Sequence, residues 1–532
     1  MKMLSACFIA LLSLTPLTAF ATSPSQCSKL ASVKLPVPKG ASTLTIGSTA
    51  LVAATPDVPE YCLVVGTIDG DINFDVGLPT SWNGKLLMIG SGGFSGYIPT
   101  WSIDQYVAFQ YAVVGTDMGQ TGDPVDLLNR PDRVANLLYR STHLVALAAK
   151  EVIRAYFRAG ASHAYFKGCS RGGDQGLVEA SRFPDDFDGI IAAAPGLASG
   201  AARIWNEQAV FPGGPANGGL IASTKIALLS NVVLQRCDKL DGVIDGVVSD
   251  PRICNFSPKD HLPRCVRDID GPRCFTKAQV AALQKIHEGP KSNGQPIGAP
   301  YFFSGNEGYS YGDYFGVGVD ILDYANNVTG FPESPILFPD YDDVGIPSDT
   351  YWFETMFLRY IIFNNPNYML QDFNFNSKSD LTSYAKGLSP AYPASPDLSN
   401  YGKRGGKLIM WHGLADSLIN SEMTREFYEA GATALGGYKT IKGFDRLFLV
   451  PGSLHCGGGP GPWTIDTLPA LEQWVENGRA PKSIPGFAPD SNTTQPICAY
   501  PKQARLISSS ADPAVAESYK CVNVSNEQDD ID

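Results

Sequence analysis

A glycine-rich junction between an expected strand and an expected helix restricts the folds that this chain can adopt. The apolar run Ala164–Lys167 leads into Gly168-Cys169-Ser170-Arg171-Gly172-Gly173, and a helix-compatible segment covers residues 175–182. This G-x-S-x-G spacing after a strand is the pattern of a nucleophile elbow, a strained turn whose glycines let the strand and helix backbones approach closely. The alternative is a glycine-rich strand-to-helix turn that contains an incidental serine.

Short apolar runs alternate with helical patterns in two separate regions of the chain. The expected strands are Lys85–Ile89, Tyr111–Gly115, Ala164–Lys167 and Gly189–Ala194 in the first region, and Lys407–Trp411 and Arg446–Val450 in the second. Apolar residues at helical spacing fill Thr142–Arg158 and, later, a segment through Leu468, Leu471 and Trp474. This alternation predicts a mostly parallel sheet that is covered by helices on both faces.

Residues 199–392 do not follow this alternation. They are rich in aromatic residues, Gly, Pro and Asp. A chain of 532 residues also exceeds the roughly 300 residues that one core supports, and its 44% hydrophobic content excludes intrinsic disorder. We therefore predict an α/β domain formed by residues 22–198 and 393–532, split by an inserted domain at 199–392. The tail after Ala488 is expected to be irregular.

The first residues have the features of a secretory signal peptide. Met1-Lys2 is a short basic start, an apolar run extends from Leu4 to Leu17, and Ala19-Phe20-Ala21 is an A-x-A cleavage pattern. We expect residues 1–21 to be removed and the mature protein to be secreted or periplasmic. The apolar run is too short to serve as a stable membrane anchor. The formal net charge of −12 argues against nucleic acid as a partner.

The cysteine count is informative in an exported chain. Apart from Cys7, ten of the eleven cysteines lie in the expected mature protein, and this even number favours five disulfides. The plausible near pairs are Cys27–Cys62, Cys237–Cys254, Cys265–Cys274 and Cys498–Cys521. Such a pairing leaves Cys169 and Cys456, far apart in the sequence, to bond to each other. The alternative is that these two are unrelated structural cysteines, since sequence alone does not prove connectivity.

The histidines that follow the serine restrict the choice of a general base. A serine nucleophile needs a base, normally histidine, that is oriented by a carboxylate, and an elbow serine takes these partners in the chain order Ser, Asp or Glu, His. Of the six histidines, two precede Ser170 and two lie in the inserted region, which leaves His412 and His455 at strand ends. Asp416 followed by His455 satisfies the order. His412 precedes Asp416 and is expected to be a hydrogen-bonded loop histidine, and the alternative is that it helps to shape the site.

The cysteine and histidine arguments converge on one place. Cys169 adjoins Ser170, and Cys456 adjoins His455. If the serine and the histidine lie within hydrogen-bond reach, the two cysteines are close as well. A disulfide between them would hold nucleophile and base together and reduce the orientational freedom that costs rate.

Cys169-Ser170, Asp416 and His455-Cys456 resemble the CS-D-HC pattern of the fungal-type tannase and feruloyl esterase family, which also includes the bacterial mono(hydroxyethyl) terephthalate hydrolase. The resemblance covers nearly the whole mature chain and extends to Trp82-Asn83-Gly84-Lys85, Arg182-Phe183-Pro184, Arg404-Gly405-Gly406-Lys407 and Trp474-Val475-Glu476. It implies an α/β-hydrolase fold with a large lid domain inserted after Pro195-Gly196. The chain departs from the family's usual Asp-x-Gly-His, since it has Asp117-Met118-Gly119-Gln120.

A serine hydrolase of this kind also needs an oxyanion hole. Its donors are usually the N–H after the nucleophile, here that of Arg171, and one from an earlier strand-end loop. That loop is Gly90-Ser91-Gly92-Gly93. Similarity to the family favours Gly93, with Gly92 as the fallback, and a flexible glycine turn is the alternative.

The inserted region contains an acidic loop from Asp238 to Val247. Its three carboxylates and its glycines suit a hard cation such as Ca²⁺, although the spacing is not that of an EF-hand, and a solvated acidic loop is an equal alternative on composition alone. The family resemblance implies a structural calcium in the lid, bound by the side chains of Asp238, Asp241 and Asp245 and the carbonyls of Val243 and Val247. No organic cofactor is expected.

The hypothesis is a carboxylester hydrolase that acts through an acyl-enzyme on small-molecule or plant cell-wall esters of aromatic acids. Hydroxycinnamate (feruloyl) esters are the preferred prediction for the substrate, and galloyl esters and terephthalate monoesters are alternatives. Aromatic segments at Tyr309–Phe315 and Tyr351–Phe363 could line a ring pocket or fill the lid core. The resemblance to the terephthalate enzyme suggests Arg359 for a substrate carboxylate, although a surface or ion-paired arginine is the simpler interpretation. A non-enzymatic, disulfide-rich carbohydrate-binding or adhesion protein is the alternative of another class.

Overall fold

The computed structural model describes residues 24–196, 200–214, 220–221, 223–309, 349–389 and 396–523. The expected signal peptide, residues 1–21, lies outside the described residues, as do both expected domain boundaries, at 198/199 and 392/393. The cleavage and the boundaries therefore stay predictions. Within the described part of the chain, no helix is long and apolar enough to cross a membrane.

A nine-stranded sheet runs through the molecule in the order β1-β2-β3-β5-β4-β6-β7-β10-β11. Its strands are β1 (Leu44–Val52), β2 (Tyr61–Ile68), β3 (Ile72–Pro79), β4 (Lys85–Ile89), β5 (Ala112–Thr116), β6 (His163–Cys169), β7 (Gly189–Ala193), β10 (Lys407–Gly413) and β11 (Asp445–Val450). The six strands from β5 to β11 in this order are parallel, and β1, β2 and β3 continue the sheet beyond β5 through antiparallel pairs. The six predicted strands are confirmed, whereas the antiparallel edge is not among the predictions.

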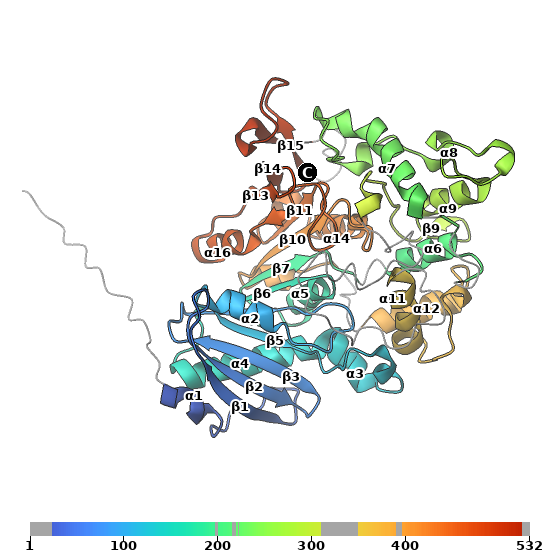
Figure 1. Ribbon diagram of the computed structural model, residues 1–532. Helices are drawn as coiled ribbons and strands as arrows, with labels where there is room; N and C mark the ends of the chain where they lie inside the picture. The colour runs from blue at the N-terminus through green and yellow to red at the C-terminus, as the bar shows by residue number, and fades with distance from the viewer. Residues whose placement is uncertain are drawn as a thin grey trace, which may run out of the picture.

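Helices cover both faces of the central sheet (Figure 1), and the side chains of its strands alternate between two apolar cores. The covering helices are α2 (Thr100–Val107), α4 (Ser141–Phe157), α5 (Arg171–Arg182), α14 (Ser421–Ala434) and α16 (Thr467–Asn477). Leu86 and Met88 of β4 share one apolar core with side chains of α4, α5 and α14. Leu87 and Ile89 share a second core with side chains of α2 and α16. Burial on both faces explains why these strands are apolar throughout.

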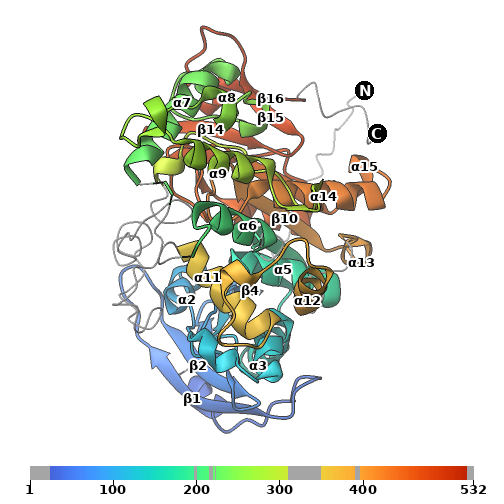
Figure 2. The same cartoon turned by 90° about the vertical axis from the view of Figure 1, so that its right-hand side faces the viewer.

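The predicted insertion leaves the sheet after β7 and returns before β10. These two strands are direct neighbours, with Gly189 opposite Lys407 and Ala193 opposite Trp411. The described α-helices of the insertion are α6 (Gly200–Val210), α7 (Ser223–Cys237), α8 (Pro258–His261), α9 (Lys277–Glu288), α11 (Asp349–Phe357) and α12 (Lys378–Leu388), and α13 (Ser399–Lys403) follows before β10. In Figure 2, α6, α9, α11 and α12 lie in front of the sheet over the middle of the molecule, and α7 and α8 lie at the top of the view. We refer to this segment as the lid domain.

The lid domain has an apolar core of its own, which extends onto loops of the sheet. Phe211, Leu229 and Phe303 belong to this core. Phe94, from the loop after β4, and Met118, from the loop after β5, are part of the same cluster. The lid is therefore packed directly on the loops at the carboxyl ends of the parallel strands, where α/β sheets bind ligands.

The C-terminal tail is more regular than expected. Small antiparallel sheets are formed by β12 (Thr464–Ile465), β13 (Ser483–Ala488) and β14 (Thr493–Cys498), and by β15 (Lys502–Leu506) and β16 (Tyr519–Asn523). The expectation of an irregular tail is therefore wrong. All five predicted disulfides are formed, and Cys498–Cys521 links the two small sheets.

Candidate active site

Ser170 occupies a strained turn between β6 and α5. Its φ of 62° is in the left-handed region, which non-glycine residues rarely adopt, and its N–H donates to the carbonyl of Ala193 at 3.0 Å. A Cβ placed on Gly90 would lie 2.9 Å from the Cα of Gly172, so the start of α5 and the loop after β4 are in backbone contact. The glycines of the motif therefore serve close packing, as the elbow pattern predicts.

Asp416 and His455 are brought together by the ends of two neighbouring strands. Asp416 follows β10, His455 follows β11, and Asp416 Oδ2 lies 2.8 Å from His455 Nδ1. Burial opposes the ionisation of Asp416, but His455 and His412 outweigh it and hold the pKa of this carboxyl well below its usual value. Asp416 is therefore an ionised acceptor that fixes the orientation of the His455 ring.

The Cys169–Cys456 disulfide joins the serine side of the site to the histidine side. Its Cα atoms are 5.9 Å apart, and the two cysteines are 287 residues apart in the sequence. Cys169 ends β6 and directly precedes Ser170, while Cys456 directly follows His455. Because β7 and β10 lie between β6 and β11 in the sheet, the bond spans the site across two strands.

Two backbone N–H groups near Ser170 are candidates for the oxyanion hole. Arg171 is the first residue of α5, and the first N–H groups of a helix have no intrahelical partner. In the loop after β4, the N–H of Gly92 donates to the Tyr97 hydroxyl at 3.2 Å, whereas that of Gly93 has no acceptor among the described residues. This difference favours Gly93 over the fallback Gly92.

The side chain of Arg171 belongs to a buried group of charges between α5 and the lid. Its Nη1 lies 3.8 Å from Asp174 Oδ2, and Arg203 of α6 pairs with Glu354 of α11 at 2.5 Å. Burial lowers the pKa of Arg171 and also raises that of Glu354, a rise that Arg203 opposes. The first ion pair lies within α5, and the second joins the lid helices α6 and α11 to each other.

Aromatic side chains of the lid contact the candidate oxyanion loop. A Cβ on Gly93 would lie 3.6 Å from the ring of Phe353, a half-buried residue of α11. Phe94 stacks on Phe353 with ring centroids 5.6 Å apart and meets Trp352 edge-on at 5.8 Å. Of the two aromatic segments singled out in the sequence, the first lies almost wholly outside the described residues, and the second contributes this wall.

The structure gives Arg359 local partners in the lid. Its Nε donates to the Tyr368 carbonyl at 2.8 Å, and its Nη2 lies 3.1 Å from the Met369 sulfur. Its suggested role in binding a substrate carboxylate stays a prediction.

The acidic loop of the lid folds around its own carboxylates. Asp238 accepts the N–H groups of Asp245 and Gly246 at 3.2 and 3.1 Å, and Asp241 accepts that of Val243 at 2.8 Å. Burial, with the charges of Asp241 and Asp238 contributing, raises the pKa of Asp245 to about 6. The atoms that this loop offers as metal ligands are all oxygens, and its carboxylates repel one another. Both features fit a hard cation.

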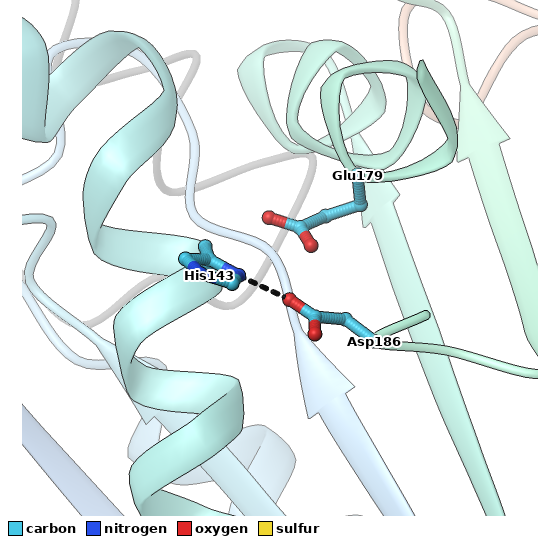
Figure 3. A group of neighbouring side chains, drawn as sticks. All are labelled: His143, Glu179 and Asp186. Atoms are coloured by element: carbon cyan, nitrogen blue, oxygen red, sulfur yellow. Dashed lines mark hydrogen bonds and ion pairs between the residues drawn. The ribbon is translucent and has the colours of Figure 1, made fainter. Parts of the chain in front are cut away.

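A second cluster consists of His143 on α4, Glu179 on α5 and Asp186, and it contains no residue of the triad (Figure 3). His143 Nδ1 is 2.5 Å from Asp186 Oδ2, and Lys150 donates to the Asp186 carbonyl. Glu179 is fully buried, and neither of its oxygens has a donor among the described residues. Burial and the neighbouring Asp186 carboxylate raise the pKa of Glu179 well above its usual value. A proton retained by Glu179 and shared with Asp186 accounts for this arrangement.

Replacement of Glu179 by glutamine is therefore expected to stabilise the protein at alkaline pH. A raised folded-state pKa means that the native protein keeps a proton that the unfolded chain releases above about pH 4.3, so stability falls by about 1.4 kcal/mol per pH unit until the folded-state pKa is reached. E179Q removes this loss. Urea unfolding at pH 5 and pH 8 should show the advantage of E179Q growing with pH. E517Q, at an exposed glutamate, is the control, and an equal difference for E179Q at both pH values would contradict the shared proton.

Comparison with known proteins finds similarity over most of the chain. Residues 57–522 match the family described as tannase and feruloyl esterase. A probable feruloyl esterase of Arthroderma benhamiae is 30% identical over 471 residues, covering 84% of this chain and 81% of the relative. The mono(2-hydroxyethyl) terephthalate hydrolase of Piscinibacter sakaiensis is 29% identical over 520 residues, covering 85% of this chain and 83% of the relative.

Solved structures share the fold. The crystal structure of feruloyl esterase B from Aspergillus oryzae matches with a TM-score of 0.77 over 94% of this chain and 99% of that chain, at 23% identity. The tannin acyl hydrolase from Aspergillus niger matches with a TM-score of 0.72 over 95% of this chain and 97% of that chain, at 20% identity.

The parallel sheet, the strained serine after β6 and the aspartate and histidine at the ends of β10 and β11 define an α/β-hydrolase. The match over most of its length shows that the chain belongs to the tannase and feruloyl esterase family. It is therefore a carboxylic ester hydrolase, as the sequence predicts, and the non-enzymatic alternative falls away.

Proposed function

We propose that this protein is an exported esterase that cleaves esters of aromatic acids, with hydroxycinnamates such as ferulate as the preferred acyl group. The observation that carries the proposal is the aromatic wall of Phe353, Trp352 and Phe94 beside Gly93. A planar acyl ring beside the reacting carbonyl could stack on this wall. The names of the relatives, probable feruloyl esterases among them, support the same substrate class.

In the proposed mechanism, Ser170 Oγ attacks the ester carbonyl and its proton passes to His455 Nε2. Asp416, bound to Nδ1, orients the ring and stabilises the imidazolium. The N–H groups of Arg171 and Gly93 stabilise the tetrahedral oxyanion. Collapse breaks the ester C–O bond, and the alcohol leaves with the proton from His455. Water, deprotonated by His455, then attacks the acyl-Ser170 ester, and its C–O bond to Ser170 breaks as His455 returns the proton to Ser170 Oγ, which releases the aromatic acid.

A matched substrate panel tests the acyl preference. Methyl ferulate, methyl gallate and a terephthalate monoester differ in the acyl ring and its substituents, and kcat/KM should be highest for methyl ferulate. A preference for gallate or for the terephthalate monoester would instead support the tannase-like or the terephthalate-monoester alternative. Negligible rates on all three would contradict an aromatic-ester hydrolase.

We further propose export, with cleavage near Ala21. The five disulfides support an oxidising compartment. The N-terminal sequence of the mature protein, recovered after expression with its natural start, tests the cleavage.

We also propose that Asp238, Asp241 and Asp245, with the carbonyls of Val243 and Val247, hold a structural calcium. The loop packs against the histidine side of the site, since a Cβ on Gly452 would lie 3.0 Å from Val247 Cγ1. The Cys237–Cys254 disulfide closes the same loop. The ion would neutralise the mutual repulsion of the carboxylates.

Removal of calcium with a chelator is expected to lower the thermal midpoint and to leave kcat unchanged while the protein stays folded. With free calcium at about 100 times its Kd, the stabilisation lost is about 2.7 kcal/mol. D245N should show a lowered midpoint that added calcium does not restore. A midpoint that does not respond to chelator or calcium would contradict the site.

A further inference from the structure

We propose that His412 is a positioning residue for the triad aspartate: its imidazole holds Asp416 so that one carboxylate oxygen faces His455. The proposal rests on the proposed function, in which Asp416 orients His455. His412 lies within β10, one residue before the strand ends, rather than in the expected loop, and it is fully buried, with an exposed fraction of 0%. Its position before Asp416 excludes it as the general base but not as a partner of that carboxylate.

The hydrogen bonds of His412 define its tautomer. Nε2 lies 3.0 Å from Asp416 Oδ2 and 3.0 Å from the carbonyl oxygen of Ile419. Both atoms are acceptors, so Nε2 carries the hydrogen. Nδ1 lies 2.8 Å from the Thr424 hydroxyl, which donates to it in the neutral ring. Thr424, on α14, thus keeps the N–H of His412 aimed at Asp416.

Four N–H groups converge on the Asp416 carboxylate. Oδ1 accepts from the backbone of Leu418 and Ile419 at 3.0 and 2.8 Å, and Oδ2 accepts from His455 and His412 at 2.8 and 3.0 Å. The Asp416 side chain is fully buried, so water cannot replace a lost donor without rearrangement. Each oxygen therefore has two donors, and the carboxylate cannot rotate without breaking bonds on both sides.

The shared oxygen couples His412 to the chemistry. The leading ionisable partners of Asp416 are the two histidines. The N–H of His412 withdraws negative charge from the oxygen that faces His455. Without this N–H, the carboxylate stabilises a protonated His455 more strongly in the free enzyme. The base then stays protonated, and the enzyme inactive, up to a higher pH. The orientation of the His455 ring would also be less well fixed, which lowers kcat rather than substrate binding.

Three substitutions separate the donor from its position. H412Q keeps an amide N–H near the place of Nε2, H412N puts one only near Nδ1, and H412L has none. With active sites counted by a serine-directed phosphonate, H412L and H412N should lose about 10-fold to 100-fold in kcat per site, with KM within about twofold. The pH of half-maximal kcat/KM on the acid side should rise. H412Q should keep kcat per site within about threefold of the wild-type value and should keep the wild-type pH profile on the acid side.

Two further variants distinguish a specific effect of His412 from general damage to the fold. T424V leaves His412 in place and should give a smaller loss and the same direction of the acid-side shift. H143L disrupts a different histidine–aspartate pair, that of His143 with Asp186, and should leave the acid side unchanged.

The outcomes are distinguishable. Phosphonate-labelled H412L with wild-type kcat and pH profile, or H412N equal to H412Q, would overturn the role of His412 alone. A wild-type enzyme that hydrolyses ester without labelling at Ser170 would overturn the proposed triad and this inference with it.

Discussion

Replacement of Ser170 by alanine is expected to lower kcat/KM for methyl ferulate by about 10⁴-fold or more. S170A removes the only atom proposed to form the acyl-enzyme, and loss of the nucleophile in a serine triad leaves only the residual rate due to the oxyanion donors and substrate binding. KM should change little, because the ring contacts and the N–H groups of Arg171 and Gly93 remain. Initial rates with the purified variant, alongside its circular dichroism spectrum, measure the effect.

Ser181, on the same helix α5, provides a matched control. Its hydroxyl donates to the Val178 carbonyl at 3.1 Å and lies outside the proposed machinery, so S181A should retain activity within about twofold. A serine-directed phosphonate should label wild type and S181A at Ser170 and leave S170A unlabelled. Folded S170A that keeps most of its activity would rule out the proposed nucleophile.

The order of the triad could be predicted because it follows from local patterns and topology. Each central strand is apolar on both faces, so the runs around Ser170 and before Asp416 and His455 stand out in the sequence. An α/β sheet then gathers the loops at the carboxyl ends of these strands. The Asp416–His455 contact in the structure is the consequence.

The antiparallel edge could not be found in the same way. β1, β2 and β3 follow one another without intervening helices, so the strand-and-helix alternation does not mark them. β1 is largely exposed, which weakens its apolar pattern further. The strands of the tail were missed for a similar reason, because they form small separate sheets.

Contacts between residues that are distant in the sequence could not be predicted from sequence patterns either. The glycine loop offered two candidate donors, and only the structure shows that Tyr97 occupies the N–H of Gly92. The link from His412 to Asp416 has a sequence signal in their four-residue spacing, but only the structure shows that Thr424 fixes the ring. The cluster of His143, Glu179 and Asp186 has no such signal.

Removal of the Cys169–Cys456 disulfide, by C169A/C456A, is expected to lower both stability and kcat. The bond closes a loop with a sequence separation of 287, and loop-closure entropy predicts a loss of about 5–6 kcal/mol in the free energy of unfolding. In the folded state, the residues beside the two cysteines are the nucleophile and the base. Without the bond the loop after β11 can shift relative to the end of β6, and a displacement of about 1 Å can cost about 100-fold in rate.

A second disulfide separates the catalytic effect from the effect on stability. Cys265–Cys274, with a sequence separation of 9, closes a short loop in the lid. C265A/C274A should lose about 2–3 kcal/mol and keep its kcat. Urea titrations give the stability of each variant, and kcat per phosphonate-titrated site at a temperature where both are folded gives the catalytic effect. If the bond beside Ser170 contributes only to stability, C169A/C456A will keep the wild-type kcat at that temperature despite its larger loss of stability. If it also positions the site, kcat will fall in C169A/C456A alone, because only this bond joins the serine and histidine loops.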